Sequence, residues 1–346
     1  MNVTFLIGNG FDLNLGLKTA YKDFYDYYIK HTKPNMLSKA ISSNYEIWAD
    51  LEIGIGNFLK EIGTNDVDYF LQCKGDLERL LSEYLLAEQR KLLFAKDDIV
   101  FKEFEQRISN FSYDFNNRDS NYWTSVISNL PESINYNFIV FNYTNTIDRI
   151  IDACLGKPFS QHKYPNNTNP IKDAITPPLH IHGNANSGMI LGINDINQIN
   201  NEELRNNRDL SNYIIKENIN SALGNMNTER ARKLIDISQF ICIYGMSIGD
   251  TDSMWWSYLI KWLLSNNKNR LILYVYSNTI VQASGQEYVR NSDMIRNKIA
   301  NHYKKLSENE LTDLRNRISI IYNSSIFDFE SIKVTEEQNG QTEDGE

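Results

Sequence analysis

Six short apolar runs, rich in β-branched residues and spread along the chain, constrain the fold most strongly. They are VTFLI, FIVF, LHIH, FICIY, LILYVY and ISIIY, at residues 3–7, 138–141, 179–182, 240–244, 271–276 and 318–322. Continuous apolar runs of this length are typical of strands buried on both faces of a parallel sheet. Helical patterns lie between several of them, and this alternation predicts an α/β fold with a doubly wound, mostly parallel sheet and right-handed crossovers.

The gap between the first two predicted strands is about 130 residues long, which is far more than one crossover connection needs. Part of it has the 3.6-residue apolar period of an amphipathic helix, carried by Leu77, Leu80, Leu81, Tyr84 and Leu85. Residues 41–130 are therefore predicted to form a large helical insertion.

This insertion divides the predicted sheet domain into two pieces. Residues 1–40 and 131–330 are expected to fold together around the sheet, and a second, polar helical stretch at 197–236 is expected to cap it. Residues 331–346 are predicted to be a disordered acidic tail, because from Thr335 onward they carry five acids and no large apolar side chain.

Charge and cysteine content exclude several classes of protein. Lysine and arginine number 35 against 44 aspartates and glutamates, a net charge of −9, which disfavours nucleic acid as a partner. The three cysteines are far apart, which argues against a disulfide framework or a structural zinc site and fits a reducing cytoplasm. The longest apolar stretch, at residues 254–264, is shorter than the ~20 residues of a bilayer span. A cytoplasmic protein without a membrane contact is expected.

Two glycines follow the first predicted strand in the sequence GNGFD, residues 8–12. Gly8 and Gly10 let the backbone turn tightly and bring N–H groups close to an anionic ligand, as in a phosphate loop. Leu13 occupies the third glycine position of GxGxxG, so the ordinary dinucleotide fingerprint is absent. The alternative is an ordinary strand-to-helix turn.

Polar residues also follow the second predicted strand, in FNYTNTID at residues 141–148. Asn142 both donates and accepts hydrogen bonds, which suits it to hold a water molecule or a ribose hydroxyl, and Asp148 is suited to accept a bond from a ribose. The alternative for Asn142 is a cap on the following helix.

Two of the five histidines lie in LHIHG, residues 179–183. His180 and His182 are two apart on a predicted strand, so their side chains are expected on the same side. Gly183 ends the strand and leaves His182 at its tip, where a neutral histidine is a candidate general base. A metal site built from the HxH pair and a buried structural histidine are the competing interpretations.

The fourth polar segment, YGMSIGDTD at residues 244–252, also follows a predicted strand. Gly245 permits the close approach of a ligand, Ser247 offers a hydroxyl, and Asp250 or Asp252 is suited to accept bonds from ribose hydroxyls, with a helix cap as the alternative for both acids. Because the carboxyl ends of parallel strands meet at one edge of a sheet, the four segments predict one site built from several loops.

Together these segments resemble the sirtuin-like family of nicotinamide-dinucleotide-binding domains. GNGFDLNLGLKT resembles the first glycine loop of that family, FNYT its TTNYD loop, LHIHG its catalytic LHG and GMSIGDTD its GYSxxDxD loop. More closely still, LIGNGFDLNLGL, WADLE at residues 48–52, FNYTNT, HIHG and ILGIND at residues 190–195 look like the abortive-infection AbiH family of phage-resistance proteins. The likeness spans about residues 3–260. The zinc cysteines of the deacetylases are absent, and Thr144 stands where the TTNYD loop has an aspartate.

The resemblance implies a sirtuin-like, Rossmann-like domain that takes NAD as its substrate, hydrolyses the nicotinamide–ribose bond and depletes NAD in phage-infected cells. It implies catalytic roles for Asn142 and His182, and no metal. The NAD contacts that it implies are Gly8, Asn9, Gly10, Asp12, Thr144, Asp148, Gly183, Gly245, Ser247 and Asp250. The phage trigger and a homo-oligomeric state are left open.

Two other functions remain as alternatives. One is a metal-dependent nuclease, in which the HxH pair joins Asp250 and Asp252 and acts on phage or host nucleic acid. The other is a non-catalytic module that senses a nucleotide, for which Thr144 in place of an aspartate is the argument.

Overall fold

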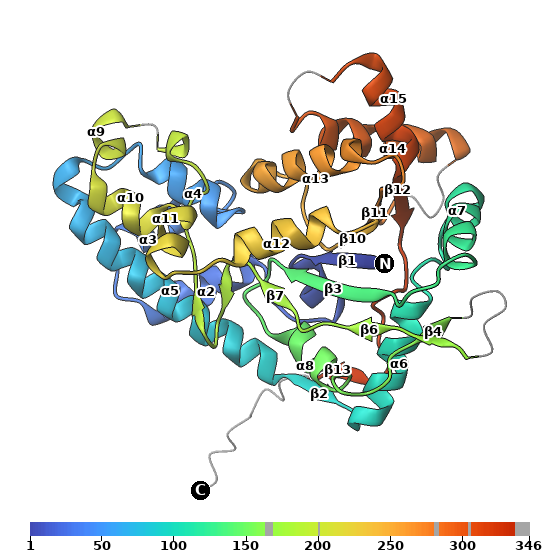
Figure 1. Ribbon diagram of the computed structural model, residues 1–346. Helices are drawn as coiled ribbons and strands as arrows, with labels where there is room; N and C mark the ends of the chain where they lie inside the picture. The colour runs from blue at the N-terminus through green and yellow to red at the C-terminus, as the bar shows by residue number, and fades with distance from the viewer. Residues whose placement is uncertain (163–168, 200, 280–283, 304–305, 336–346) are drawn as a thin grey trace, which may run out of the picture.

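A parallel sheet of seven strands forms the centre of the molecule (Figure 1). The computed structural model describes residues 1–162, 169–199, 201–279, 284–303 and 306–335. The strand order is β12-β11-β10-β1-β3-β6, and β7 pairs with β3 beyond the end of β6. Numbered along the chain, with β6 and β7 sharing one edge position, this is the doubly wound order 3-2-1-4-5-6 of Rossmann-like folds. The predicted fold class is confirmed.

The sheet strands lie where the apolar runs predict them. They are β1 (Asn2–Ile7), β3 (Asn135–Val140), β6 (Ala174–Ile175), β7 (Leu179–His180), β10 (Phe240–Tyr244), β11 (Arg270–Val275) and β12 (Ile318–Tyr322). Every pairing between them is parallel. Strand β1 lies in the middle, because its side chains are buried on both faces of the sheet and it pairs with β3 on one side and β10 on the other.

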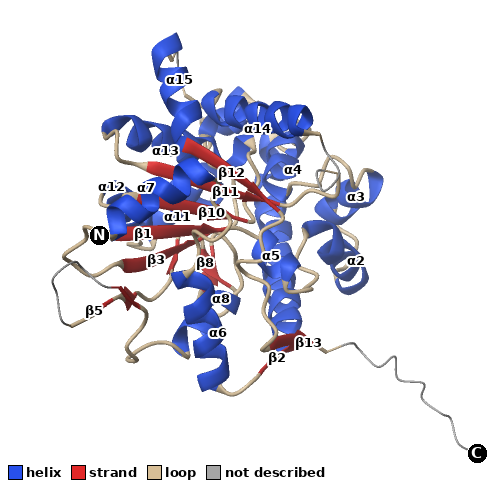
Figure 2. Cartoon of the chain, turned by 90° about the vertical axis from the view of Figure 1, so that its right-hand side faces the viewer, coloured by secondary structure: helices blue, strands red, loops and turns tan. Residues whose placement is uncertain are grey.

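Helices cover both faces of this sheet, as Figure 2 shows. Phe5, Phe138 and Cys242 lie in a core on one face and Leu6, Ile139 and Ile241 in a core on the other, as the period of two in a strand requires. The first face is covered by α6 (Asp97–Ser109), α7 (Asn117–Ile127), α8 (Thr146–Asp152) and the short α1 (Gly10–Asn14). The second face is covered by α12 (Asn227–Asp236), α13 (Ser253–Ser265), α14 (Gly285–Ala300) and α15 (Glu308–Arg317).

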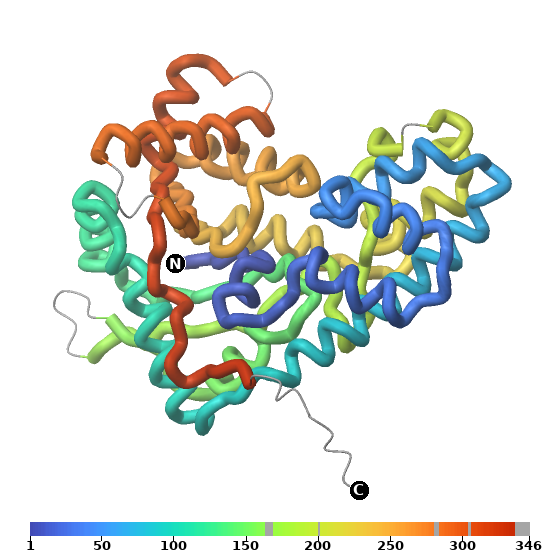
Figure 3. Tube along the Cα trace, turned by 180° about the vertical axis from the view of Figure 1, so that it is seen from behind, coloured from blue at the N-terminus to red at the C-terminus, as the bar shows by residue number. Residues whose placement is uncertain are grey.

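A separate helical cluster lies to one side of the sheet (Figures 1 and 3). It consists of α2 (Tyr21–His31), α3 (Met36–Ser43), α4 (Leu51–Phe58), η1 (Thr64–Asp66), α5 (Val67–Arg90), η2 (Ile196–Gln198), α9 (Glu202–Arg205), α10 (Arg208–Ile214) and α11 (Lys216–Ala222). The cluster has a hydrophobic core separate from the two cores that flank the sheet, and this core contains the predicted apolar stripe of α5. Figure 3 shows the early segment and the 190–220 segment side by side there, although they are distant in sequence.

The packing groups the helices differently from the predicted ranges. Helix α2 and most of α3 lie in the range 1–40, which was expected to fold around the sheet, but both belong to the helical cluster. Helices α6 and α7 lie in the predicted insertion, but they pack on the sheet. In the polar stretch at 197–236, α9 and α10 join the helical cluster and only α12 covers the sheet. An apolar period shows that a helix buries one face, but it does not show what that face packs against.

A small two-stranded sheet corrects the expected start of the tail at residue 331. Strand β13 (Ile332–Val334) pairs antiparallel with β2 (Leu92–Phe94), and Ile332 is buried in the core on the α6 face. The part of the predicted tail at 336–346 lies outside the described residues. The remaining short elements are β4 (Gln161–His162), β5 (Ile171–Lys172), β8 (Gly183–Asn184), β9 (Gly188–Met189) and η3 (Asp250–Asp252).

The substitution Ile332→Ala should lower the free energy of unfolding by about 2 kcal/mol, because it removes buried methyl groups and leaves a cavity under β13. Chemical denaturation measures the change. Lys333→Ala on the same strand is the control, because the Lys333 side chain is exposed and its removal should leave the stability unchanged. Equal stability of the two variants would show that β13 does not contribute to the core.

Candidate functional site

A cavity of about 1190 Å³ lies at the carboxyl ends of the sheet strands. Its wall contains the residues that follow β1, β3, β10 and β11, together with side chains from the helical cluster. The chain reverses its direction across the sheet between β1 and β10, and open α/β sheets bind their ligands in the crevice at such a point. The position of the cavity is therefore that of a ligand site.

Three glycines hold the loops after β1 and β10 together beneath this cavity. A Cβ atom added to Gly10 would lie 2.5 Å from the Cα of Gly245, and one added to Gly8 would lie 2.5 Å from its carbonyl oxygen. Gly245 has φ +71°, a conformation that favours glycine. The Gly8 N–H donates to Tyr244 O and the Gly10 N–H to Gly245 O, each over 2.9 Å. The sequence suggested that these two amides face a phosphate; they instead join the two loops.

Asp12 lies beneath the cavity wall and fixes two residues from the loop after β3. Its Oδ2 accepts hydrogen bonds from Asn142 Nδ2 over 3.0 Å and from Thr144 Oγ1 over 2.6 Å. Burial raises the pKa of Asp12 to about 6, although these bonds oppose the shift. Asn142 and Thr144 line the cavity, whereas Asp12 does not. Asp12 thus positions the Asn142 amide, whose buried Oδ1 has no partner among the residues that the structure describes.

His180 makes the second buried polar contact behind Asn142. Its Nε2 lies 2.8 Å from Asp148 Oδ2, and its Nδ1 lies 3.2 Å from the Asn142 carbonyl oxygen. Asp148, predicted to bind a ribose, is instead the partner of this histidine and does not line the cavity.

His182 lines the cavity and has a different environment from His180. Its Nδ1 is buried and has no hydrogen-bond partner within the described part of the chain, and its ring lies 6.1 Å from the Phe141 ring in an edge-to-face arrangement. Burial, with a smaller contribution from the Lys216 ammonium, holds the pKa of His182 well below its ordinary value. The ring is therefore neutral near pH 7.

One end of the cavity carries three carboxylates, and we call it the acidic end. Asp50 caps the N-terminus of α4, Glu52 lies in its first turn, and Asp252 ends η3. Lys216 of α11 forms an ion pair with Glu52. Burial raises the pKa of Glu52 to about 7, against the opposing effect of Lys216, and burial raises the pKa of Asp252 to about 6.

Sequence reasoning missed Asp50, Glu52 and Lys216 as site residues. They belong to the helical cluster, and only the WADLE motif at residues 48–52 pointed to two of them. The Thr251 hydroxyl donates to Asp50 Oδ2 over 3.2 Å and so connects α4 to the loop after β10. A tertiary contact between two bodies of the fold thus brings these side chains to the cavity.

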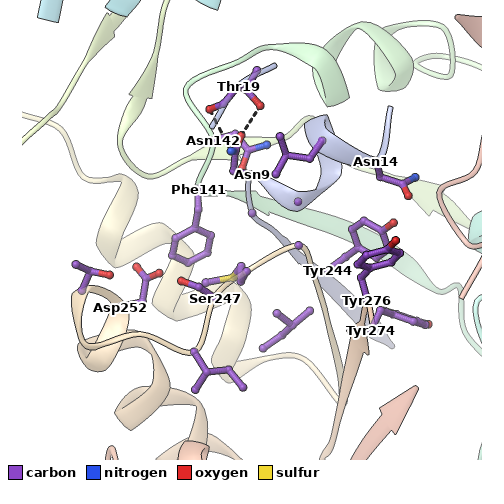
Figure 4. A pocket seen from close by; sticks show the side chains of 18 of the residues that line it. Asn9, Asn14, Thr19, Phe141, Asn142, Tyr244, Ser247, Asp252, Tyr274 and Tyr276 are labelled. Carbon is purple, nitrogen blue, oxygen red and sulfur yellow. Dashed lines mark hydrogen bonds between the residues drawn. The ribbon is translucent and has the colours of Figure 1, made fainter. Parts of the chain in front are cut away.

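The other end of the cavity is aromatic, and we call it the tyrosine end. It contains Tyr244, which ends β10, Tyr274, which lies near the end of β11, and Tyr276, which follows β11. Figure 4 shows these three rings on one side of the cavity and Phe141, Ser247 and Asp252 on the other. The cavity therefore has two chemically distinct ends with the glycine loops between them.

Eight of the predicted site residues line this one cavity: Gly8, Asn9, Gly10, Asn142, Thr144, His182, Gly245 and Ser247. Asp12 and Asp148 lie behind its wall, as described above. Gly183 has φ +64°, and a Cβ there would lie 1.9 Å from Gly188 O, so this glycine serves the β8–β9 hairpin. Asp250 is exposed at the start of η3 and does not line the cavity.

The nuclease alternative would require the HxH pair, Asp250 and Asp252 to form a metal site. Among the described residues, no three histidine, cysteine, aspartate or glutamate side chains are arranged to hold a metal ion. Both ring nitrogens of His180 have protein partners. None of the helices in the described part of the chain has the length and apolar character that a bilayer crossing requires.

The strand order and the cavity at the switch point define a Rossmann-like α/β protein with helical insertions. The chain belongs to the AbiH family: the model of that family, described as bacteriophage abortive infection AbiH, matches residues 4–276. This membership indicates a role in phage defence by abortive infection. A search of curated proteins found no match.

The contact between the glycine loops makes Gly10→Ala destabilising, because the new Cβ would overlap the backbone of Gly245. A loss of about 3 kcal/mol in the free energy of unfolding is expected. Gly75→Ala is the matched control: Gly75 lies inside α5 with open space around its Cα, so the alanine should raise the stability by about 1 kcal/mol. A Gly10→Ala protein as stable as the wild type would refute the contact.

Proposed function

We propose that the protein binds NAD in this cavity and hydrolyses its nicotinamide–ribose bond, so that infected cells lose NAD. The observation that carries the proposal is a pair of unpartnered buried atoms among the cavity-lining residues, Asn142 Oδ1 and His182 Nδ1. A buried polar atom without a partner is costly, and a ligand that bonds to it removes that cost. These are also the two residues to which the sirtuin-like resemblance gives catalytic roles.

The shape and chemistry of the cavity suit a dinucleotide. A ring such as adenine stacks favourably on tyrosines, which are present at one end. The other end carries the polar groups that a ribose and a reacting bond require, and the loops of Gly8, Gly10 and Gly245 lie between the two ends without side chains to obstruct a diphosphate. The volume of about 1190 Å³ accommodates a ligand of this size.

The proposed reaction breaks the bond between the ribose carbon and the nicotinamide nitrogen, and the oxygen of a water molecule takes the place of the ring. Its transition state resembles an oxocarbenium ion, so orientation and charge stabilisation matter more than a strong nucleophile. Asn142 Oδ1 accepts a hydrogen bond from the ribose or the water. His182, which is neutral, takes the proton that the water releases.

The buried Asp12 places a carboxylate beside Thr144, which stands where the sirtuin-like pattern has an aspartate. The TTNYD loop has an aspartate at the position of Thr144, and here the Thr144 hydroxyl donates to the Asp12 carboxylate from the loop after β1. The same carboxylate fixes the Asn142 amide. A carboxylate is thus retained beside this loop, which supports a catalytic site over a purely sensing one.

His182→Ala should reduce nicotinamide release from NAD by about 10²- to 10⁴-fold, because it removes the proton acceptor. The fold should be retained, since Nδ1 of His182 makes no hydrogen bond to any residue that the structure describes. The measurement is release of nicotinamide and ADP-ribose by the purified full chain.

His180→Ala is the comparison, because it breaks two buried contacts behind Asn142 and should lower the melting temperature clearly more than His182→Ala does. Wild-type rates in the His182→Ala protein would refute the assignment of the base. Binding of NAD by the wild type without any nicotinamide release would instead favour the nucleotide-sensing alternative.

A further inference from the structure

The acidic end of the cavity has an excess of negative charge that the protein itself does not balance. Three carboxylates, of Asp50, Glu52 and Asp252, line it with one ammonium group, that of Lys216. Lys216 is committed to Glu52 by a buried ion pair. Asp50 accepts bonds from the backbone of α4 and from Thr251.

Asp252 differs from the other two carboxylates, because it accepts no hydrogen bond from the residues that the structure describes. Lys216 influences it only as a charge at a distance. Burial of an unpaired carboxylate is unfavourable, so a cationic group placed beside it would be stabilised.

Two further features of the same cavity point to a ligand. Asn142, which is 6% exposed, lines it, and its buried Oδ1 has no hydrogen-bond partner among the described residues. Phe141 lies between His182 and Trp255, with ring centroids 6.1 and 5.6 Å away, and it also lines the cavity. An aromatic ring beside carboxylates suits a flat, positively charged heterocycle.

We propose that the acidic end receives the cationic pyridinium ring of NAD, and that Asp252 and Glu52 select this oxidised dinucleotide over the reduced form, whose nicotinamide ring is neutral. The inference rests on the proposed function, to which it adds an orientation and two specificity-determining residues. The adenosine half then lies toward the tyrosine end. In this arrangement the helical cluster supplies Glu52, and the sheet supplies Asp252.

The preference should depend on pH, because a cation binds best to ionised carboxylates. Burial raises the pKa of Asp252 to about 6 and that of Glu52 to about 7, so both gain charge as the pH rises from 5.5 to 8. Burial raises the pKa of Tyr21 and of Tyr143 well above the ordinary value, and these hydroxyls keep their protons.

The other charged groups that act on Asp252 and Glu52 are Asp50 and Lys216, and His182 and Lys298 line the same cavity. Burial keeps His182 neutral, since its pKa lies well below the ordinary value. The affinity for a cationic ring should therefore increase with pH through the range from about 6 to 7, while the affinity for a neutral ring should not.

The test measures binding by calorimetry and does not depend on turnover. The probes are carba-NAD, whose carbocyclic ribose prevents cleavage while the ring keeps its positive charge, and the reduced form of carba-NAD. The main variant is Asp252→Asn, which removes a charge without breaking a hydrogen bond to a described residue. Glu52→Gln is the second variant, with its melting temperature recorded because it leaves Lys216 unpaired. Asp328→Asn is the matched control. Asp328 is an exposed residue that lines the same cavity, and its carboxylate charge acts on Tyr244.

We expect the wild type at pH 8 to bind carba-NAD about tenfold more tightly than its reduced form, and to lose this preference at pH 5.5. Asp252→Asn should abolish most of the preference at pH 8, Glu52→Gln should do the same in a folded protein, and Asp328→Asn should retain it. An unchanged preference in Asp252→Asn, with both probes still bound, would overturn the inference and leave the proposed function intact. Failure of the wild type to bind either probe would overturn both.

Discussion

The parallel pairing of β1 with β3 on one side and β10 on the other is the interaction on which the rest of the structure depends. Ile7, the last residue of β1, is paired with Val140 of β3 and with Tyr244 of β10, so three loops leave the sheet at the same level. The glycines after β1 and β10 then let two of these loops touch through their backbones. Without this common level, the polar residues that follow each strand would not share one cavity.

Buried polar groups behind the cavity wall give the site its rigidity. Asp12 holds the side chains of Asn142 and Thr144, and His180 bridges Asp148 and the Asn142 backbone. Burying a carboxylate is costly, which is why burial raises the pKa of Asp12, but each of these bonds restricts the loop after β3 to one conformation. The result is a preorganised amide whose buried Oδ1 has no hydrogen-bond partner among the described residues.

The helical cluster completes the cavity as well as packing around its own core. Lys216 reaches the acidic end because its backbone N–H donates to Ile193 O over 2.9 Å, within the ILGIND motif, while a Cβ at Gly192 would lie 2.0 Å from Ile214 O. The Asn194 amide of the same motif donates to the Thr251 carbonyl beside Asp252. Two AbiH-like sequence motifs, WADLE and ILGIND, thus act at one contact between the helical cluster and the sheet.

The sequence by itself determined the strands, the parallel sheet and the polar loops that follow it, because these depend on local periodicity and on the rule that parallel strands end at one edge. It also pointed to Asn142 and His182, through residue chemistry at strand ends. Only the tertiary structure decided the roles of Asp12 and Asp148, since a carboxylate at a strand end turns toward whichever partner the neighbouring loops supply. It also showed that Gly183 serves the β8–β9 hairpin. It alone brought Glu52 and Lys216, 164 positions apart in the chain, into one ion pair. Contacts between side chains that far apart depend on how two independently packed bodies meet, and no local pattern in the sequence encodes that.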